Sequence, residues 1–120
     1  MRRSIVEACR KTTYTKTIYG RLRRLPLIKS TNRRDVEHAE RQAFNTAIQA
    51  SCADLFKLAA IRTKKFNDAR FVFGVFDSLL LQVPKDLSDE RAVEIIEELS
   101  DFRDLFPGLK FRYSYAMGMN

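Results

Sequence analysis

Apolar side chains dominate one stretch of the chain, residues 71–84, where aromatic, β-branched and leucine residues surround a single carboxylate, Asp77. This composition predicts two strands, over residues 71–76 and 79–83, and Pro84 ends the second because it lacks the N–H that a ladder needs. A buried charge without a cation is costly, so the hairpin is expected to leave Asp77 at an open tip. Asp is common in hairpin turns, which explains the residue on this run alone, but a tip carboxylate is also suited to hold a divalent metal ion.

Two segments have the composition of helices. Residues 33–63 contain neither Pro nor Gly, and Asn32 is a suitable N-cap, so the longest helix of the chain is expected there. A second helix is expected from a cap at Ser88 to about Phe102, with acidic residues in its first turn that complement the helix dipole. Apolar residues recur along it at spacings of three and predict one buried stripe, made of Val93, Ile96, Leu99 and Phe102.

The first 32 residues alternate between regular and irregular patterns. Residues 3–11 are expected to form a short helix, and residues 12–19 are rich in β-formers and are expected to be extended. Residues 20–32 are expected to form an irregular arm, because Gly20 breaks the pattern and Pro26 forbids a helix across it.

The C-terminal residues 109–116 alternate between apolar and polar types after a Pro-Gly turn. This alternation predicts a strand with one buried face, to which Tyr113 and Tyr115 belong. Base stacking by these tyrosines is the alternative, but an aromatic face buried in a core is the commoner case. The order of elements predicts an α+β fold, a small antiparallel sheet with helices packed on one face.

Length and composition fit one domain, or a fragment of one, over residues 1–120. The chain carries no run of about 18 apolar residues, so no membrane partner is expected. Cys9 and Cys52 lack metal-ligand spacing and are interpreted as reduced thiols, and the single His38 cannot build a His-based metal site or a catalytic triad.

Positive charge is concentrated at the N-terminus. The net charge of +7 divides into a balance of +10 over residues 1–34, +1 over residues 35–70 and −4 over residues 71–120. A basic arm, residues 1–32, joined to an acidic C-terminal part suggests that a polyanion binds at one end, and nucleic acid is the obvious candidate. A solvated basic surface explains the charge nearly as well.

Three polar residues of the long helix, Arg41, Asn45 and Gln49, follow one another at intervals of four. At 3.6 residues per turn they lie within about 80° of one another. Arg, Asn and Gln all donate hydrogen bonds, and the minor-groove edges of both kinds of base pair offer acceptors, so the row could contact DNA without sequence preference. Ordinary surface residues of an amphipathic helix remain the alternative.

Four short motifs stand out along the chain. They are an arm with Tyr14, Thr17, Gly20, Arg21, Arg23, Leu25 and Pro26; a helix with Arg41, Asn45, Gln49, Ala53 and Asp54; the run Val75-Phe76-Asp77-Ser78-Leu79; and the tail Ser114 to Asn120. Together they resemble family A DNA polymerases, the bacterial DNA polymerase I family and its phage relatives. They occur in the family's order over nearly the whole chain.

The resemblance implies a partial polymerase palm and roles for particular residues. Asp77 matches the metal-binding aspartate of the family's third catalytic motif, so Mg²⁺ is the implied cofactor. The helix row, Arg41, Asn45 and Gln49, matches residues that touch the minor groove of primer-template DNA. A basic arm near the DNA backbone is implied for Arg21, Arg23 and Arg24.

The departures from the family pattern are equally specific. Phe76 stands where the family has His, and Ser78 stands where it usually has Glu, although Ser occurs in some phage members. The family's second catalytic aspartate (motif A) and the fingers residues that bind the incoming nucleotide precede the region that this chain matches.

The sequence therefore predicts the C-terminal palm portion of a DNA polymerase, completed by a second polypeptide that carries motif A, the fingers and the deoxynucleoside triphosphate site. A bacterial host cytoplasm, for a phage-encoded chain, is the expected location. The alternatives are a non-catalytic nucleic-acid-binding module that kept the palm shape, and a structural protein whose exposed sheet and helix faces dock on a partner.

Overall fold

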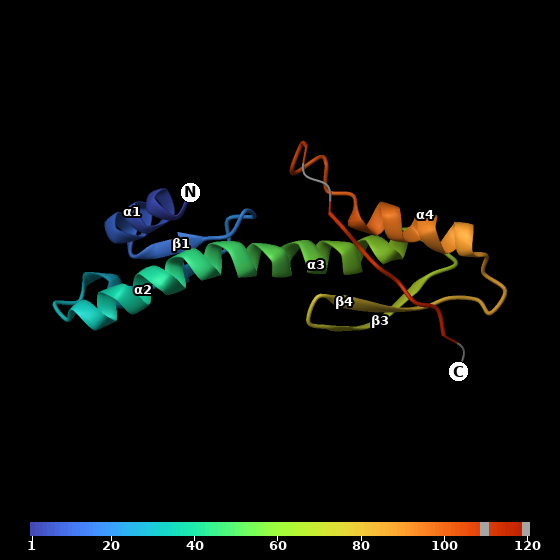
Figure 1. Ribbon diagram of the computed structural model, residues 1–120, viewed down its shortest axis with the longest axis horizontal. Coiled ribbons are helices and arrows are strands. Elements are labelled where there is room, and N and C mark those ends of the chain that lie inside the picture. Colours follow the sequence, from blue (N-terminus) through green and yellow to red (C-terminus); the bar gives the residue numbers. More distant parts are fainter. Residues whose placement is uncertain (109–110, 119–120) are drawn as a thin grey trace. The chain divides into compact units, whose positions relative to one another are not determined.

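The computed structural model describes residues 1–108 and 111–118 and divides the chain into two compact units, residues 1–56 and 57–120 (Figure 1). Over these described residues the fold is α+β, as predicted, with two separate two-stranded antiparallel sheets, β1–β2 and β3–β4. The elements are α1 (Arg2–Thr12), β1 (Tyr14–Lys16), β2 (Leu22–Arg24), η1 (Pro26–Lys29), α2 (Arg33–Asn45), η2 (Thr46–Ala50), α3 (Ser51–Arg62), η3 (Thr63–Lys65), β3 (Arg70–Val75), β4 (Ser78–Gln82) and α4 (Asp89–Ser100).

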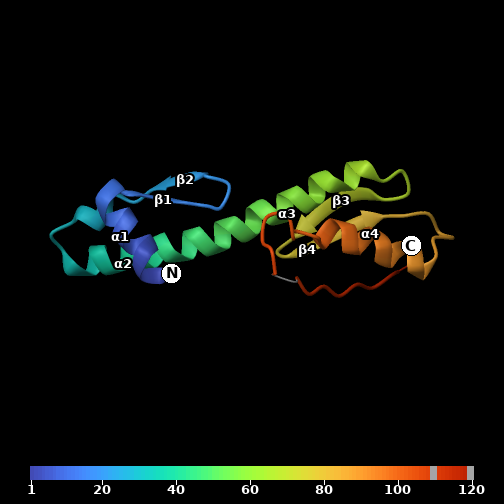
Figure 2. The same cartoon turned by 90° about the horizontal axis from the view of Figure 1, so that it is seen from above.

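The first unit is built on α2, against which α1 and the β1–β2 hairpin lie (Figure 2). The Asn32 side chain caps α2 by accepting a hydrogen bond from the backbone N–H of Arg34, as the sequence predicts. The buried cluster that joins these elements combines small residues of α2 with apolar residues of the N-terminal segments. Its members are Cys9, Leu25, Ile28, Ala39 and Ala43.

The segment 20–32 is more regular than the sequence predicts, so the expectation of an irregular arm is wrong. It contains the strand β2 and the 3₁₀ helix η1, with Pro26 at the start of η1. Pro is tolerated there because the first N–H of a helix has no intrahelical partner. Gly20 has φ +80° and permits the turn in which its N–H donates to the carbonyl of Thr17.

The predicted long helix is present as a continuous run of helical elements from residue 33 to residue 62. The run changes its hydrogen-bonding pattern in the middle, where Thr46–Ala50 form a π-helical turn between α2 and α3. Such turns insert an extra residue into a helix and often occur at functional sites. No Gly or Pro marks this turn, so the sequence provides no signal for it.

The second unit combines the predicted hairpin with the predicted capped helix. In β3–β4, Phe73 faces Leu80 and Val75 faces Ser78, with a bulge between residues 71 and 73. The helix α4 lies over one face of the hairpin (Figure 1), and its Ser88 side chain accepts a hydrogen bond from the N–H of Arg91.

The buried stripe of α4 is rotated from the predicted one. Its buried residues are Ala92, Ile95 and Leu99, whereas Val93 and Ile96 are half-buried. The observed stripe combines spacings of three and four, as helical geometry allows, and the position of the neighbouring hairpin decides which side of the helix is buried. Of the predicted set, Leu99 and Phe102 are correct.

The predicted C-terminal strand is wrong for the part of it that the structure describes. Residues 111–118 join no ladder, and Tyr113 and Tyr115 are exposed, while residues 109–110 and 119–120 lie outside the described residues. The ring of Phe111 does pack edge-on against the ring of Phe102, with 5.3 Å between the two ring centroids. Alternation predicts a strand only when a neighbouring edge is available to pair with it.

An ion pair connects the first turns of α4 to the segment before β3. Arg91 donates to the carboxylate of Asp68 over 2.7 Å, and this guanidinium holds the pKa of Asp68 below its ordinary value of 3.8. A lowered carboxyl pKa means that the pair contributes stability above the ordinary pKa, and that this stability is lost as pH falls through the native value.

We therefore expect Asp68→Asn to lower the thermal midpoint of unfolding at neutral pH, with the difference from wild type shrinking toward zero as the pH falls through the native pKa. Circular dichroism melts at a series of pH values measure it. Asp86→Asn removes an exposed carboxylate from the loop before α4 and is the control. A deficit that persists unchanged in acid would contradict the electrostatic explanation.

Candidate nucleic-acid interface and hairpin tip

The β1–β2 hairpin is attached to the helical run by side-chain hydrogen bonds at successive points. Thr15 Oγ1 donates to the carbonyl of Ala43 over 3.1 Å, and the N–H of Ile18 donates to Ser51 Oγ over 3.0 Å. Thr15 and Ser51 are both buried, so each of these bonds satisfies a hydroxyl that water cannot reach. The hairpin therefore has a defined position along the helical run, between Ala43 of α2 and Ser51 of α3.

Arg21 and Asp54 connect two of the motifs that the sequence singled out. Arg21 donates to the Asp54 carboxylate over 2.8 Å and to the carbonyl of Ala50 over 3.1 Å. The Asp54 side chain is 12% exposed, so a cation beside it offsets the cost of removing the carboxylate from water. These bonds assign Arg21 a structural role, that of anchoring the hairpin turn to the helix.

The helix row Arg41, Asn45 and Gln49 is exposed, which fits both a DNA contact and an ordinary helix surface. Asn45 ends α2 and Gln49 lies in the π-helical turn, so the row crosses the change in helix type. Asn45 and Gln49 line an open hollow of about 280 Å³ between helix and hairpin, together with four other residues. These are Arg23, Gln42, Thr46 and Ala50, and Arg41 is not among the lining residues.

Two residues of the hollow, Gln42 and Thr46, were missed by sequence reasoning. Gln42 precedes Asn45 by three positions and Thr46 precedes Gln49 by three, so helical spacing could have included them. The amide nitrogen of Gln42 lies 2.9 Å from His38 Nε2, which makes His38 a neighbour of the site. Thr46 accepts a hydrogen bond from Arg23 Nη1 over 2.9 Å.

The turn between β3 and β4 consists of Phe76 and Asp77, and both side chains are exposed. The prediction that Asp77 lies at an open hairpin tip is therefore correct. Ser78 is the first residue of β4 and faces Val75 across the hairpin. In the described residues, no cluster of three or more His, Cys, Asp or Glu side chains has metal-binding geometry, so Asp77 offers a single carboxylate rather than a complete site.

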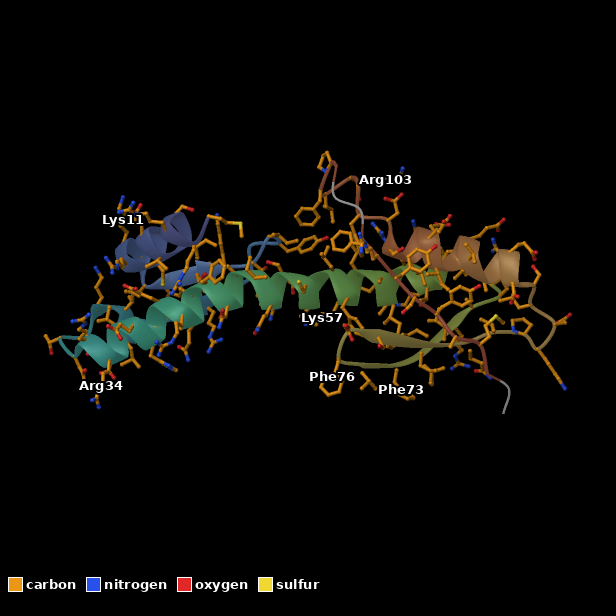
Figure 3. All side chains as sticks on the ribbon, viewed as in Figure 1. Lys11, Arg34, Lys57, Phe73, Phe76 and Arg103 are labelled. Carbon is orange, nitrogen blue, oxygen red and sulfur yellow. The ribbon has the colours of Figure 1, made fainter. Side chains whose placement is uncertain are left out.

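Phe76 is unusual in both conformation and exposure. Its φ of +53° is left-handed, a region that costs a residue with a β-carbon about 1–2 kcal/mol, and its side chain is 98% exposed. Figure 3 shows Phe76 and Phe73 projecting from the hairpin on the side away from α4. Packing within the described residues does not explain a strained, exposed aromatic ring.

Comparison with known proteins identifies the family to which the chain is similar. The profile of DNA polymerase family A matches residues 1–119. The chain is 44% identical over 86 residues to DNA polymerase I of Mycobacterium tuberculosis and 35% identical over 99 residues to the thermostable DNA polymerase I of Thermus thermophilus. These matches cover 68% and 80% of this chain, but only 10% and 12% of the relatives.

A solved structure agrees with the sequence matches. The polymerase domain of Pol1 from M. smegmatis, solved in complex with a DNA primer-template and dNTP, superposes with a TM-score of 0.69 at 35% identity. The match covers 88% of this chain and 19% of that one. The chain belongs to DNA polymerase family A, and it spans about a tenth of the length of the bacterial polymerases that it matches.

No helix among the described residues is both long enough and apolar enough to cross a membrane.

We expect Phe76→Asn to stabilise the protein by about 0.5–1 kcal/mol, because Asn tolerates a left-handed φ better than Phe does. Urea denaturation measures the free energy of unfolding. Phe76→Ala is the matched control, since it removes the ring without introducing the short polar side chain that lets Asn adopt a left-handed φ. An equal gain for Ala and Asn would show that strain is not the reason.

Proposed function

We propose that this chain supplies part of the palm of a DNA-directed DNA polymerase and contributes to template-directed nucleotidyl transfer. The observation that carries the proposal is the exposed Asp77 at the tip of an apolar hairpin, in a chain that matches the polymerase family along residues 1–119. The structural relative in complex with a primer-template and dNTP supports DNA and deoxynucleoside triphosphates as ligands.

Asp77 is proposed as one carboxylate ligand of Mg²⁺. Its exposure at a turn leaves the carboxylate accessible, and oxygen ligands are those that Mg²⁺ prefers. When bound, a pair of such ions supplies a clamp on the attacking and leaving oxygens of an in-line displacement. The donor set of the described residues fits this group only in part, because one carboxylate does not bridge two ions.

A second polypeptide, or a further segment of a longer polymerase, is therefore part of the proposal. It would carry the other catalytic aspartate and the residues that bind the incoming nucleotide. The exposed apolar side chains of the hairpin support such a neighbour, because Val72, Phe73, Val75 and Leu80 are each about half exposed. Alone, the chain is expected to be catalytically inactive. A phage-encoded subunit acting in the cytoplasm of a bacterial host is the proposed setting.

The primer-template is proposed to lie against the helix row Arg41, Asn45 and Gln49. These side chains are exposed, and Asn45 and Gln49 open into the hollow beside the hairpin. Amide and guanidinium donors can meet the acceptors that every base pair presents in the minor groove, so contact would not depend on sequence. The basic residues Arg23 and Arg24 would lie near the DNA backbone.

A non-catalytic DNA-binding module is the second candidate, and the hairpin tip favours it. Phe76 and Ser78 replace the polar residues that the family places on either side of the aspartate. Loss of polar groups around Asp77 is what a relaxed active site would show, while the row on α2 and η2 would retain its DNA contacts. Duplex binding without any contribution to synthesis distinguishes this candidate.

We expect Asp77→Asn to reduce primer extension by about a thousandfold, equivalent to about 4 kcal/mol of transition-state stabilisation, when the chain acts with the rest of the polymerase. The substitution keeps the size of the side chain and removes the charge that a metal ion needs. The measurement is single-turnover extension of a labelled primer as a function of Mg²⁺ concentration.

Asp86→Asn is the matched control, an exposed Asp of the same unit that lies outside the turn, and it should extend primers at the wild-type rate. Unchanged extension by Asp77→Asn would remove the metal role. Extension that never depends on this chain, alongside salt-sensitive duplex binding, would establish the second candidate instead.

A further inference from the structure

The π-helical turn Thr46–Ala50 keeps one face of the helical run buried. On either side of the turn, the buried residues of this face follow one another at steps of three or four, as α-helical geometry requires. Across the turn the step is five, from Thr46 to Ser51. The extra residue therefore returns the buried face to the same side of the helix. The residues of this face in the first unit are Ala39, Ala43, Thr46, Ser51 and Leu55.

Two arginines of the β1–β2 hairpin hold the ends of the turn. Arg23 donates to the hydroxyl of Thr46, the first residue of the turn, over 2.9 Å. Arg21 donates to the carbonyl of Ala50, the last residue of the turn, over 3.1 Å. An irregular turn leaves acceptors outside the regular hydrogen-bond ladder of the helix, and these need other donors. The hairpin supplies one such donor at each end.

Ser51 connects the middle of the turn to the hairpin. Its Oγ donates to the carbonyl of Ala47, inside the turn, and accepts a hydrogen bond from the N–H of Ile18 over 3.0 Å. One hydroxyl therefore bridges the backbone of the hairpin and the backbone of the turn. Ser51 is 7% exposed, so water has little access to replace either bond. Loss of the hydroxyl would remove a donor at the point where the hydrogen-bonding pattern of the helix changes.

The turn determines the direction of Gln49 relative to Asn45. Asn45 is the last residue of α2, and Gln49 lies within the turn. Four residues make slightly more than one turn of an α-helix, which places residues four apart about 40° apart around the axis. A π-helical turn contains more residues, so the same four make slightly less than one turn. Relaxation to an α-helix would therefore rotate Gln49 relative to Asn45, with which it lines one hollow.

We propose that Ser51 is a positioning residue for DNA contact. Its hydroxyl, held by the hairpin, keeps residues 46–50 in the π-helical form and so sets the direction of the Gln49 amide. This inference rests on the proposed function, in which the helix row meets the minor groove. It gives the β1–β2 hairpin the further role of shaping the helix row, through a residue that helical spacing does not place in that row.

The first test is equilibrium binding of the complete chain to a fluorescent DNA duplex at low salt. Ser51→Ala and Gln49→Ala are each expected to weaken binding about fivefold, the equivalent of one hydrogen bond. In the Gln49→Ala background, Ser51→Ala is expected to cause no further loss, because its effect passes through the Gln49 amide. Arg41 lies before the turn, so the losses from Ser51→Ala and Arg41→Ala are expected to multiply.

Two further variants separate the hydroxyl from other effects of the substitution. Ser51→Thr keeps the hydroxyl and is expected to bind duplex within about twofold of wild type. Ser100→Ala is the matched control, because Ser100 also donates to a carbonyl four positions back, that of Ile96 over 2.8 Å, but in α4. It is expected to leave duplex binding unchanged. Circular dichroism melts establish that each variant is folded.

The second test measures the turn itself and needs no DNA. Nuclear magnetic resonance couplings through hydrogen bonds, between amide nitrogen and carbonyl carbon, distinguish a bond to the residue five positions back from one to the residue four back. Wild type and Ser51→Thr are expected to show five-position bonds across residues 46–50. In Ser51→Ala these are expected to give way to four-position bonds. If Ser51→Ala is unfolded, Ser51→Cys, a weak hydrogen-bond donor of similar size, takes its place in both tests.

The outcomes separate this inference from the proposed function. If Ser51→Ala keeps the five-position bonds, or weakens binding equally with and without the Gln49 amide, the positioning role is wrong and the DNA contact stands. A Ser51→Thr variant that binds as weakly as Ser51→Ala would also overturn it, because the hydroxyl would then not be the cause. If the wild-type chain does not bind duplex at low salt, the proposed DNA contact fails and the positioning role fails with it.

Discussion

The hydrogen bonds between the β1–β2 hairpin and the helical run are the constraint on which the N-terminal unit depends. Thr15, Thr46 and Ser51 are buried hydroxyls, and each is bonded between the hairpin and the helix. A buried hydroxyl without a partner costs a few kcal/mol. Shifting the hairpin by one residue would leave several of these hydroxyls without a partner and would therefore destabilise the fold. Directional polar contacts, more than apolar area, therefore set the hairpin's position and the hollow beside it.

The C-terminal unit is organised by the opposite principle, burial of one face of a hairpin. Leu81 packs with Ile95 and Leu99 beneath α4, whereas Phe73 and Leu80, a cross-strand pair, remain half exposed on the other face. Two strands alone are marginal in water, so α4 supplies the support that keeps the Phe76-Asp77 turn in place. The exposed apolar face beside this strained tip supports the proposal that further polymerase segments pack there.

Most elements were predictable because their signals are local. Asn32 and Ser88 cap helices where the sequence places them, Pro84 follows the end of β4, and the apolar run around Asp77 forms a hairpin with the carboxylate at its tip. The predictions that were wrong are those that depend on which other element a segment packs against. The buried stripe was predicted one residue out of phase in the first half of α4, and the alternating C-terminal segment found no strand to pair with among the described residues.

Local patterning therefore determined the helices, the hairpins, the exposure of Asp77 and the row Arg41, Asn45 and Gln49, because capping, turn chemistry and periodicity act between residues close in sequence. Only the tertiary structure decided which arginine meets which partner. Arg21 and Arg23 are two residues apart in one basic segment, yet one is paired with a partly buried carboxylate and the other with a hydroxyl at an open hollow. That difference depends on which residue of a helix more than 20 positions away lies opposite each strand position, and no local pattern encodes it.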